Sequence, residues 1–323
     1  MKKQYKVDLI IPIYNAEEWI PSLLATLEKQ KMADFRVIFV DDGSKDDSYN
    51  ILNDRLRGVK FPYLLLRQEN QGPSAARNLG MRHAQADWIA FMDCDDELKP
   101  EFLEYLYNGV SGKDCQMGFC QLEMIPRGSA QQPQPAEPFG AAPMTAEAAM
   151  EKHYTSWIAP VCLILNRQWV MDHALEFDTE CRYCEDLMFI TRCIVAARTV
   201  VQIPVSLYVY WTHAGSLLRS SDISKYQNGM EGFARLEKAL ESNDSSAAKV
   251  FFAMGRSRFL LGIVRRAALQ LTLKDFMGIA RQAKLEDCRY QSGRLPLKQK
   301  IAFYIYLISK RLFYYVVRTA FKD

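Results

Sequence analysis

Short apolar runs alternate with amphipathic stretches through the first hundred residues. Each run has the length of a buried strand, and the four begin at Val7, Phe35, Tyr63 and Asp87. Stretches with helical periodicity separate them, at about 20–29, about 45–56 and around 75–80. Alternating strands and helices are typical of a parallel sheet covered by helices. We therefore predict an α/β fold whose first strand is central and ends where Pro12 and Asn15 break its ladder.

The second half of the chain predicts further strands and then a helical extension. Strand-like runs occur at 115–122 and, in two pieces, at 201–204 and 207–211, and a helix opens at 185. A stretch rich in proline and glutamine, 126–138, is interpreted as a mobile loop that need not have a role. Beyond about Ser220 the pattern is helical. The chain is thus predicted to have a mixed, mostly parallel sheet and three parts, at 1–110, 111–220 and 221–323.

Carboxylates gather at the end of the fourth apolar run, in Asp93-Cys94-Asp95-Asp96. Carboxylates this close repel one another at neutral pH unless a positive charge offsets them. A Mg²⁺ ion does so with one or two protein carboxylates and the phosphates of a substrate. Because ligands of parallel sheets bind beyond the carboxyl ends of the strands, this segment predicts a metal–diphosphate site. The alternative is a solvated acidic turn that caps the next helix.

Composition narrows the class of protein. The 323 residues are 49% hydrophobic, enough for a sizeable core, and the net charge of +3 argues against a general nucleic-acid binder. The eight cysteines show no paired metal spacing, so zinc is not expected. Scattered cysteines, and a start that leads directly into a strand without a signal peptide, predict a cytoplasmic protein.

Several motifs, in this order and spacing, resemble family 2 glycosyltransferases of the GT-A fold. They lie at 11–15, 40–44, 70–80, 93–96, 184–189 and 208–216, and the resemblance covers about two-thirds of the chain, residues 5–220. The resemblance implies inverting transfer of a sugar from a nucleoside diphosphate donor, usually UDP-linked, to an acceptor hydroxyl. It also implies the Rossmann-like sheet of that fold.

The predicted donor-binding residues come from the first motifs. Asp42 is a candidate acceptor for the ring N–H of uracil, with capping of the next helix as the alternative. Tyr14 could stack on the base or pack in the core, and Arg77 could clamp the diphosphate or form a surface ion pair. Gly72 lets the backbone pass close to the nucleotide. The full predicted substrate-binding set is Pro12, Tyr14, Asn15, Glu17, Asp42, Asn70, Gly72, Arg77, Asp93, Asp96 and Glu185.

The family pattern implies Mn²⁺ or Mg²⁺ held by Asp95. It gives Asp93 a ribose or water-mediated contact, and Asp96 either supports the site from behind or faces the sugar. The metal would neutralise the departing diphosphate. His213 is a further candidate ligand, and its alternative is a loop histidine that contacts phosphate or nothing.

The resemblance makes Asp186 the general base. Beside Glu185 and near a diphosphate, its pKa would be raised, which suits proton abstraction near neutral pH. The structural alternative is that both carboxylates simply favour the start of a helix.

The terminal segment, 294–323, carries seven Lys or Arg residues and one acid. Its apolar positions fall on one helical face, its cations on the other, with aromatic residues at the border. We interpret it as an interfacial membrane helix, and the alternative is a helix packed on the catalytic domain. The apolar face consists of Ile301, Ile305, Ile308, Leu312 and Val316.

Two other functions are less consistent with the sequence than a glycosyltransferase. A nucleotidyltransferase usually has a glycine-rich basic loop near its first strand, and residues 10–18 have neither glycine nor a basic residue. A non-catalytic sugar-binding subunit would be expected to lack the acids that are present. A dehydrogenase is excluded because no G-x-G-x-x-G follows the first strand. The expected setting is bacterial surface polysaccharide synthesis, with a saccharide or lipid-linked acceptor at the inner face of the cell membrane.

Overall fold

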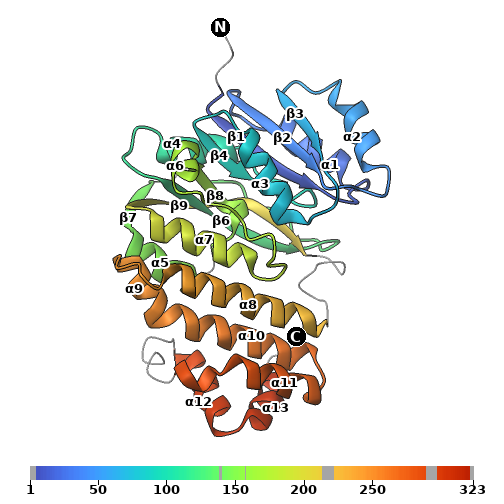
Figure 1. Cartoon of the computed structure of the whole chain (residues 1–323). Coiled ribbons are helices and arrows are strands. Elements are labelled where there is room, and N and C mark those ends of the chain that lie inside the picture. Colours follow the sequence, from blue (N-terminus) through green and yellow to red (C-terminus); the bar gives the residue numbers. More distant parts are fainter. Residues whose placement is uncertain (1–4, 138–139, 157, 213–221, 289–296, 321–323) are drawn as a thin grey trace.

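A single mixed sheet organises the chain. The computed structural model describes residues 5–137, 140–156, 158–212, 222–288 and 297–320. In these residues nine strands pair in the order β3-β2-β1-β4-β8-β6-β9-β5, and β7 pairs with β9 (Figure 1). The strands are β1 (Val7–Ile13), β2 (Phe35–Asp41), β3 (Tyr63–Arg67), β4 (Trp88–Phe91), β5 (Glu97–Leu98), β6 (Met117–Pro126), β7 (Ala142–Thr145), β8 (Leu163–Asn166) and β9 (Thr199–Thr212). The predicted mixed sheet flanked by helices is confirmed.

Helices cover both faces of the sheet. The apolar residues of α1 (Ile20–Glu28), α2 (Ser48–Leu56) and α4 (Phe102–Val110) share one core with one face. The opposite core joins the other face to α3 (Pro73–His83), α5 (Ala146–Ser156), α6 (Arg167–Asp172) and α7 (Glu185–Ala196). Along β1, Leu9 and Ile11 face the first core and Ile10 the second, as the alternation of a pleated strand requires.

Pro12 does not end β1, contrary to the sequence-based expectation. The strand continues to Ile13, and Pro12 stands opposite Val40 of β2. β4 pairs with β1 only as far as Ile10, so the side of Pro12 that lacks an N–H faces no ladder partner. The missing donor therefore costs no strand hydrogen bond.

Three other boundaries differ from the prediction. The helix expected from about 45 begins at Ser48, because Asp46 accepts hydrogen bonds from the backbone N and the Oγ of Ser48. The two runs at 201–204 and 207–211 form one strand, β9, whose exposed Pro204 lies where the register with β6 shifts. The terminal helix is divided at Ser309, into α12 and α13.

The predicted helical C-terminal extension is confirmed, and it packs against the sheet's own core. One apolar cluster runs from Ile10 in β1 to Val317 near the end of the chain. Figure 1 shows α8 beneath α7, α10 beneath α8, and the last helices at the end of the molecule away from the sheet. The helices are α8 (Ile223–Leu240), α9 (Ser246–Val250), α10 (Arg256–Gln270), α11 (Leu273–Ala283), α12 (Leu297–Ile308) and α13 (Lys310–Ala320), with a π-helical turn (Phe251–Gly255) before α10. The division into parts at 110 and 220 stays a prediction.

Candidate active site

The acidic segment after β4 divides its carboxylates among different partners. Asp93 accepts a 2.7 Å hydrogen bond from Arg77, and Asp96 is almost fully buried. Asp95 is half-buried and lines a hollow of about 230 Å³. Burial and the neighbouring Asp93 and Asp95 raise the pKa of Asp96 to about 8. Asp96 also lines the hollow, so the three acids differ in ion pairing and burial: Asp93 is ion-paired, Asp96 is almost fully buried and Asp95 is half-buried.

Tyr208 of β9 holds both ends of this acidic segment, a role that the sequence did not predict. Its hydroxyl accepts a 3.1 Å hydrogen bond from the backbone N of Asp93 and donates a 2.7 Å hydrogen bond to Asp96. Asp96 also accepts from the backbone N of Trp211, at 2.9 Å. Asp96 therefore anchors the end of β9 to the segment, and its predicted sugar contact stays a prediction. The only sequence signal for Tyr208 was its place in the motif at 208–216.

Arg127, also missed by the sequence-based interpretation, crosses the outer side of the segment. Its guanidinium lies 4.0 Å from the ring centroid of Trp19 and 5.6 Å from that of Trp211. It also donates to the backbone oxygen of Asp95. The stacked cation thus fixes the backbone of Asp95 beside the hollow.

Arg77 joins the acidic segment to the predicted base. Its guanidinium is almost fully buried and lies 2.7 Å from Asp93 and 3.5 Å from Asp186 at the start of α7. It also stacks over Phe177, 5.3 Å from the ring centroid. Because its partners are the site's own acids, the structure gives Arg77 a positioning role, and its contact with the donor diphosphate stays a prediction.

The two carboxyls that open α7 have raised pKa values. Burial raises the pKa of Asp186 above its usual value; Arg77 opposes this rise and Asp93 adds to it. Burial and Asp186 raise the pKa of Glu185 to about 7, again against Arg77. The side chain of Asp186 keeps 32% of its surface exposed, so an acceptor can reach it. This agrees with the raised pKa expected for a base.

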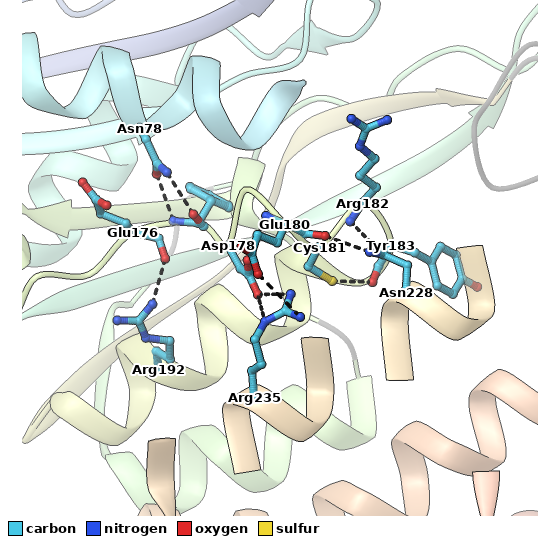
Figure 2. A network of polar contacts seen from close by, with 11 residues as sticks. Asn78, Glu176, Asp178, Glu180, Cys181, Arg182, Tyr183, Arg192, Asn228 and Arg235 are labelled. Atoms are coloured by element: carbon cyan, nitrogen blue, oxygen red, sulfur yellow. Dashed lines mark hydrogen bonds and ion pairs between the residues drawn. The ribbon is translucent and has the colours of Figure 1, made fainter. Parts of the chain in front are cut away.

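The loop that delivers α7 is held by neighbouring elements (Figure 2). Asn78 of α3 brackets Phe177, since its amide donates to the backbone O and accepts from the backbone N, both at 2.9 Å. Arg192 of α7 donates to the backbone oxygens of Ala174 and Glu176, both at 3.1 Å. These contacts fix the path of the chain just before the predicted base.

Helix α8 holds the same loop from the other side. Arg235 donates two hydrogen bonds to Asp178, at 3.0 and 2.7 Å. Asn228 donates to the backbone O of Glu180 at 2.7 Å and accepts from the backbone N of Arg182 at 2.6 Å (Figure 2). The C-terminal helical region therefore takes part in shaping the site.

The carboxylate of Asp42 is surrounded by donors from its own part of the chain. Its carboxylate accepts four hydrogen bonds from the loop after β3, and an ionised carboxylate has about four acceptor positions. The donors are the side chains of Gln68 and Asn70 and the backbone N atoms of Gln71 and Gly72, at 2.7–3.3 Å. Gly72 follows this loop with a φ of +91°, which favours glycine. Asp42 and Asn70 thus fold the loop, and their nucleotide contacts stay predictions.

Residues after β1 accept hydrogen bonds from the loop after β2, so the segments that follow these two strands are connected. Asn15, at φ +48°, accepts a 2.8 Å hydrogen bond from the backbone N of Lys45, and Glu17 accepts one of 3.1 Å from that of Asp47. Tyr14 is 43% exposed at this edge of the sheet, where it can meet a flat ring. His213 lies outside the described residues.

Comparison with known proteins agrees with this geometry. The model of the family described as Glycosyl transferase family 2 matches residues 8–173. EpsH of Bacillus subtilis is 26% identical over 253 residues, 74% of this chain and 70% of that protein. The glycosyltransferase GlyG of Streptococcus pneumoniae is 24% identical over 246 residues, 71% of this chain and 78% of that protein.

Solved structures share the fold at low sequence identity. Staphylococcus aureus TarS 1–349 in complex with UDP-GlcNAc has a TM-score of 0.72 and 19% identity, covering 98% of this chain and 91% of that one. The mannosyltransferase PcManGT of Pyrobaculum calidifontis, in complex with GDP-Man and Mn²⁺, has a TM-score of 0.57 and 15% identity, covering 100% and 89%. With the family match over half the chain, the predicted family is confirmed: the protein belongs to glycosyltransferase family 2 and has the GT-A fold.

Proposed function

We propose that this glycosyltransferase moves a sugar from a UDP-sugar, or another nucleoside diphosphate sugar, to an acceptor hydroxyl with inversion. The observation that carries the proposal is the buried Arg77, which bridges Asp93 of the acidic segment and Asp186 of α7. Inversion in one step needs one base on the acceptor side, opposite the leaving group. The geometry supports separate donor and acceptor sides, because Asp93 and Asp186 approach the Arg77 guanidinium from different elements.

The chain's own residues would perform most of the reaction. Asp186 would accept the proton of the acceptor hydroxyl as that oxygen attacks the sugar. Arg77 would favour the ionised form of Asp186 before the acceptor binds and would keep Asp93 in place beside the donor. Tyr208 would hold the acidic segment in one shape, so that the donor meets preformed contacts.

The carboxylate oxygens of the acidic segment suit a Mn²⁺ or Mg²⁺ ion that binds together with the sugar nucleotide. Asp93 is paired with Arg77, Asp96 accepts from Tyr208 and Trp211, and both Asp95 and Asp96 line the hollow. Within the described ranges, no group of three or more His, Cys, Asp or Glu side chains could hold a metal. An ion at Asp95 would therefore need diphosphate oxygens, as Mg²⁺ commonly does, and it would supply charge neutralisation for the leaving group.

The solved structures of similar fold support a sugar nucleotide as donor, and the setting is the one expected from the sequence. The TarS complex holds UDP-GlcNAc and the PcManGT complex holds GDP-Man with Mn²⁺. We accordingly favour a hexosyl- or N-acetylhexosaminyltransferase of bacterial surface polysaccharide synthesis that works in the cytoplasm, with a saccharide or lipid-linked acceptor. The nucleotidyltransferase and the non-catalytic subunit gain no support from the family match.

A panel of nucleotides tests the donor. Thermal shift is measured with Mn²⁺ and one of four ligands: UDP-GlcNAc, UDP-Glc, UDP or GDP-Man. We expect the uridine nucleotides to bind and to raise the melting temperature of the protein. A ligand at about 100 times its Kd stabilises the folded state by roughly 2.7 kcal/mol. The UDP-sugar that raises the melting temperature should also be hydrolysed slowly by the enzyme in the absence of acceptor, releasing UDP. Failure of every nucleoside diphosphate to bind, or release of pyrophosphate from UTP and a sugar phosphate, would contradict the proposal.

The raised pKa values predict how the rate depends on pH. Asp186 must be ionised to accept a proton, and the pKa values of both Asp186 and Glu185 are raised, that of Glu185 to about 7. Protonation of the pair therefore begins near neutrality as the pH falls, and kcat should decline between about pH 8 and about pH 5. Glu185→Gln removes one of the two coupled carboxyls and should move the decline to lower pH. A flat profile across that range would exclude a base with a raised pKa.

A further inference from the structure

Helices α12 and α13 have an aromatic inner face that is buried. Tyr306 donates a 2.6 Å hydrogen bond to the backbone O of Ala280, and Tyr314 donates one of 3.1 Å to that of Leu271. Phe303, Phe313 and Val317 are also buried in this core. The two helices are thus fixed to α10 and α11 by this face, and its residues are not available to a partner.

The opposite face exposes aliphatic and tyrosine side chains, where a surface helix usually carries charged and polar residues. Of the ten large apolar side chains exposed in the described part of the chain, six lie here. Their exposed fractions are 73% for Leu297, 53% for Ile301, 50% for Tyr304, 79% for Ile308, 48% for Leu312 and 57% for Tyr315. We call these six residues the outer face. A concentration of exposed apolar side chains is typical of a site that binds another protein or a membrane.

The charged side chains that α12 and α13 themselves carry are all cationic. Residues 297–320 contain five Lys or Arg residues and no Asp or Glu. Lys310 is paired with Glu286, and Arg318 donates to the last carbonyls of α10. Lys298, Lys300 and Arg311 flank the outer face by helical periodicity, and Lys298 and Arg311 are exposed. The surface therefore combines apolar side chains with a border of cations.

We propose that the outer face of α12 and α13 lies on a membrane that contains anionic lipid. Ile, Leu and Tyr side chains would enter the boundary between headgroups and acyl chains, and Lys298, Lys300 and Arg311 would meet lipid phosphates. Tyrosine suits this depth because its ring is apolar and its hydroxyl is polar. The contact is peripheral: none of the described helices has the length and hydropathy needed to span a bilayer.

Charge argues for a membrane over a second copy of the chain. A twofold interface would press the outer face against itself and bring Lys298, Lys300 and Arg311 of the two copies together, without an acid in α12 or α13 to offset them. An anionic lipid surface matches both the apolar side chains and their border. This contact is independent of the sugar-transfer reaction, because α12 and α13 lie at the end of the molecule away from the sheet (Figure 1).

Flotation of the full-length protein with lipid vesicles tests the proposal. The wild type is expected to float with vesicles of phosphatidylcholine containing about 30% phosphatidylglycerol, and much less with phosphatidylcholine alone or at high salt. The variant Ile301→Ser/Ile308→Ser/Leu312→Ser should lower the partition coefficient by roughly 10- to 100-fold. Lys298→Glu/Lys300→Glu/Arg311→Glu should lose the preference for anionic vesicles. All substituted side chains are at least partly exposed, and thermal melts check that the variants fold.

A matched control removes the same number of exposed apolar side chains elsewhere. Tyr63→Ser/Met124→Ser/Met171→Ser replaces side chains that are 41–51% exposed on other elements, and it should float like the wild type. Equal flotation of the wild type and the outer-face variant, or no binding of the wild type to anionic vesicles, would overturn the proposal. So would a dimer in light scattering that the outer-face variant converts to a monomer while neither protein floats.

Discussion

Asp186→Asn is expected to lower the turnover number by roughly 10²- to 10⁴-fold, the usual contribution of a general base. Asparagine keeps the size of the side chain but cannot accept a proton at neutral pH. Loss of the carboxylate also leaves Arg77 with Asp93 as its remaining close ion-pair partner, so the donor side of the site should stay folded. Affinity for UDP should therefore change by no more than about 3-fold.

The measurement pairs initial rates with calorimetric titration of UDP. Glu185→Gln is the matched control, because Glu185 is the adjacent carboxyl on the same helix turn, and Arg77 forms its ion pair with Asp186 and not with Glu185. It should retain far more activity than Asp186→Asn. If instead Asp186→Asn turns over at a near-normal rate, or Glu185→Gln suffers the larger loss, the base is not Asp186.

Asp95→Asn is expected to abolish most of the metal-dependent gain in donor affinity. An amide oxygen is a neutral and weaker ligand for a hard divalent cation than a carboxylate. Titration of UDP with and without Mn²⁺ should show a gain for the wild type that falls by roughly 10- to 100-fold in the variant. Binding without metal should be similar in both proteins, because Asp93 and Asp96 keep their partners on Arg77 and Tyr208.

Asp87→Asn is the control for this experiment. Asp87 is an exposed acid just before β4, at the opposite end from Asp95, so its loss tests for general effects of removing a negative charge. A variant of Asp95 that keeps the full metal effect would remove Asp95 from the metal site. Loss of the effect in Asp87→Asn as well would point to non-specific metal binding.

The sequence predicted the elements and their polar ends because both are local. Apolar runs placed β1 to β4, and Asp93, Asp95 and Asp96 follow the carboxyl end of β4, where the sequence placed them. The confirmed family and fold followed from the order of these motifs. Local pattern could not give the partners of each acid. Tyr208 meets Asp96 across 112 positions, and no periodicity links residues so far apart.

Single polar residues were harder to interpret than elements. Asp42 has the same sequence context whether it binds a nucleotide or its own loop, and only the fold shows four protein donors around it. The terminal helix was predicted to be amphipathic from its aliphatic stripe. Its aromatic residues were predicted to border that stripe. The structure instead buries Phe303, Phe313, Tyr306 and Tyr314, the last two with hydrogen bonds to backbone oxygens, and leaves Tyr304 and Tyr315 exposed.

Helix α8 holds the loop before α7 by hydrogen bonds, and this limits how the enzyme can be recombined with its relatives. The family match ends at residue 173, before the loop, whereas Asn228 and Arg235 hold that loop from well beyond the match. A chimera could join the sheet of one glycosyltransferase to the C-terminal helices of another at residue 220. The loop before α7 and the α8 side chains that hold it would then come from different proteins. Crossover points for exchanging specificity therefore belong after α8.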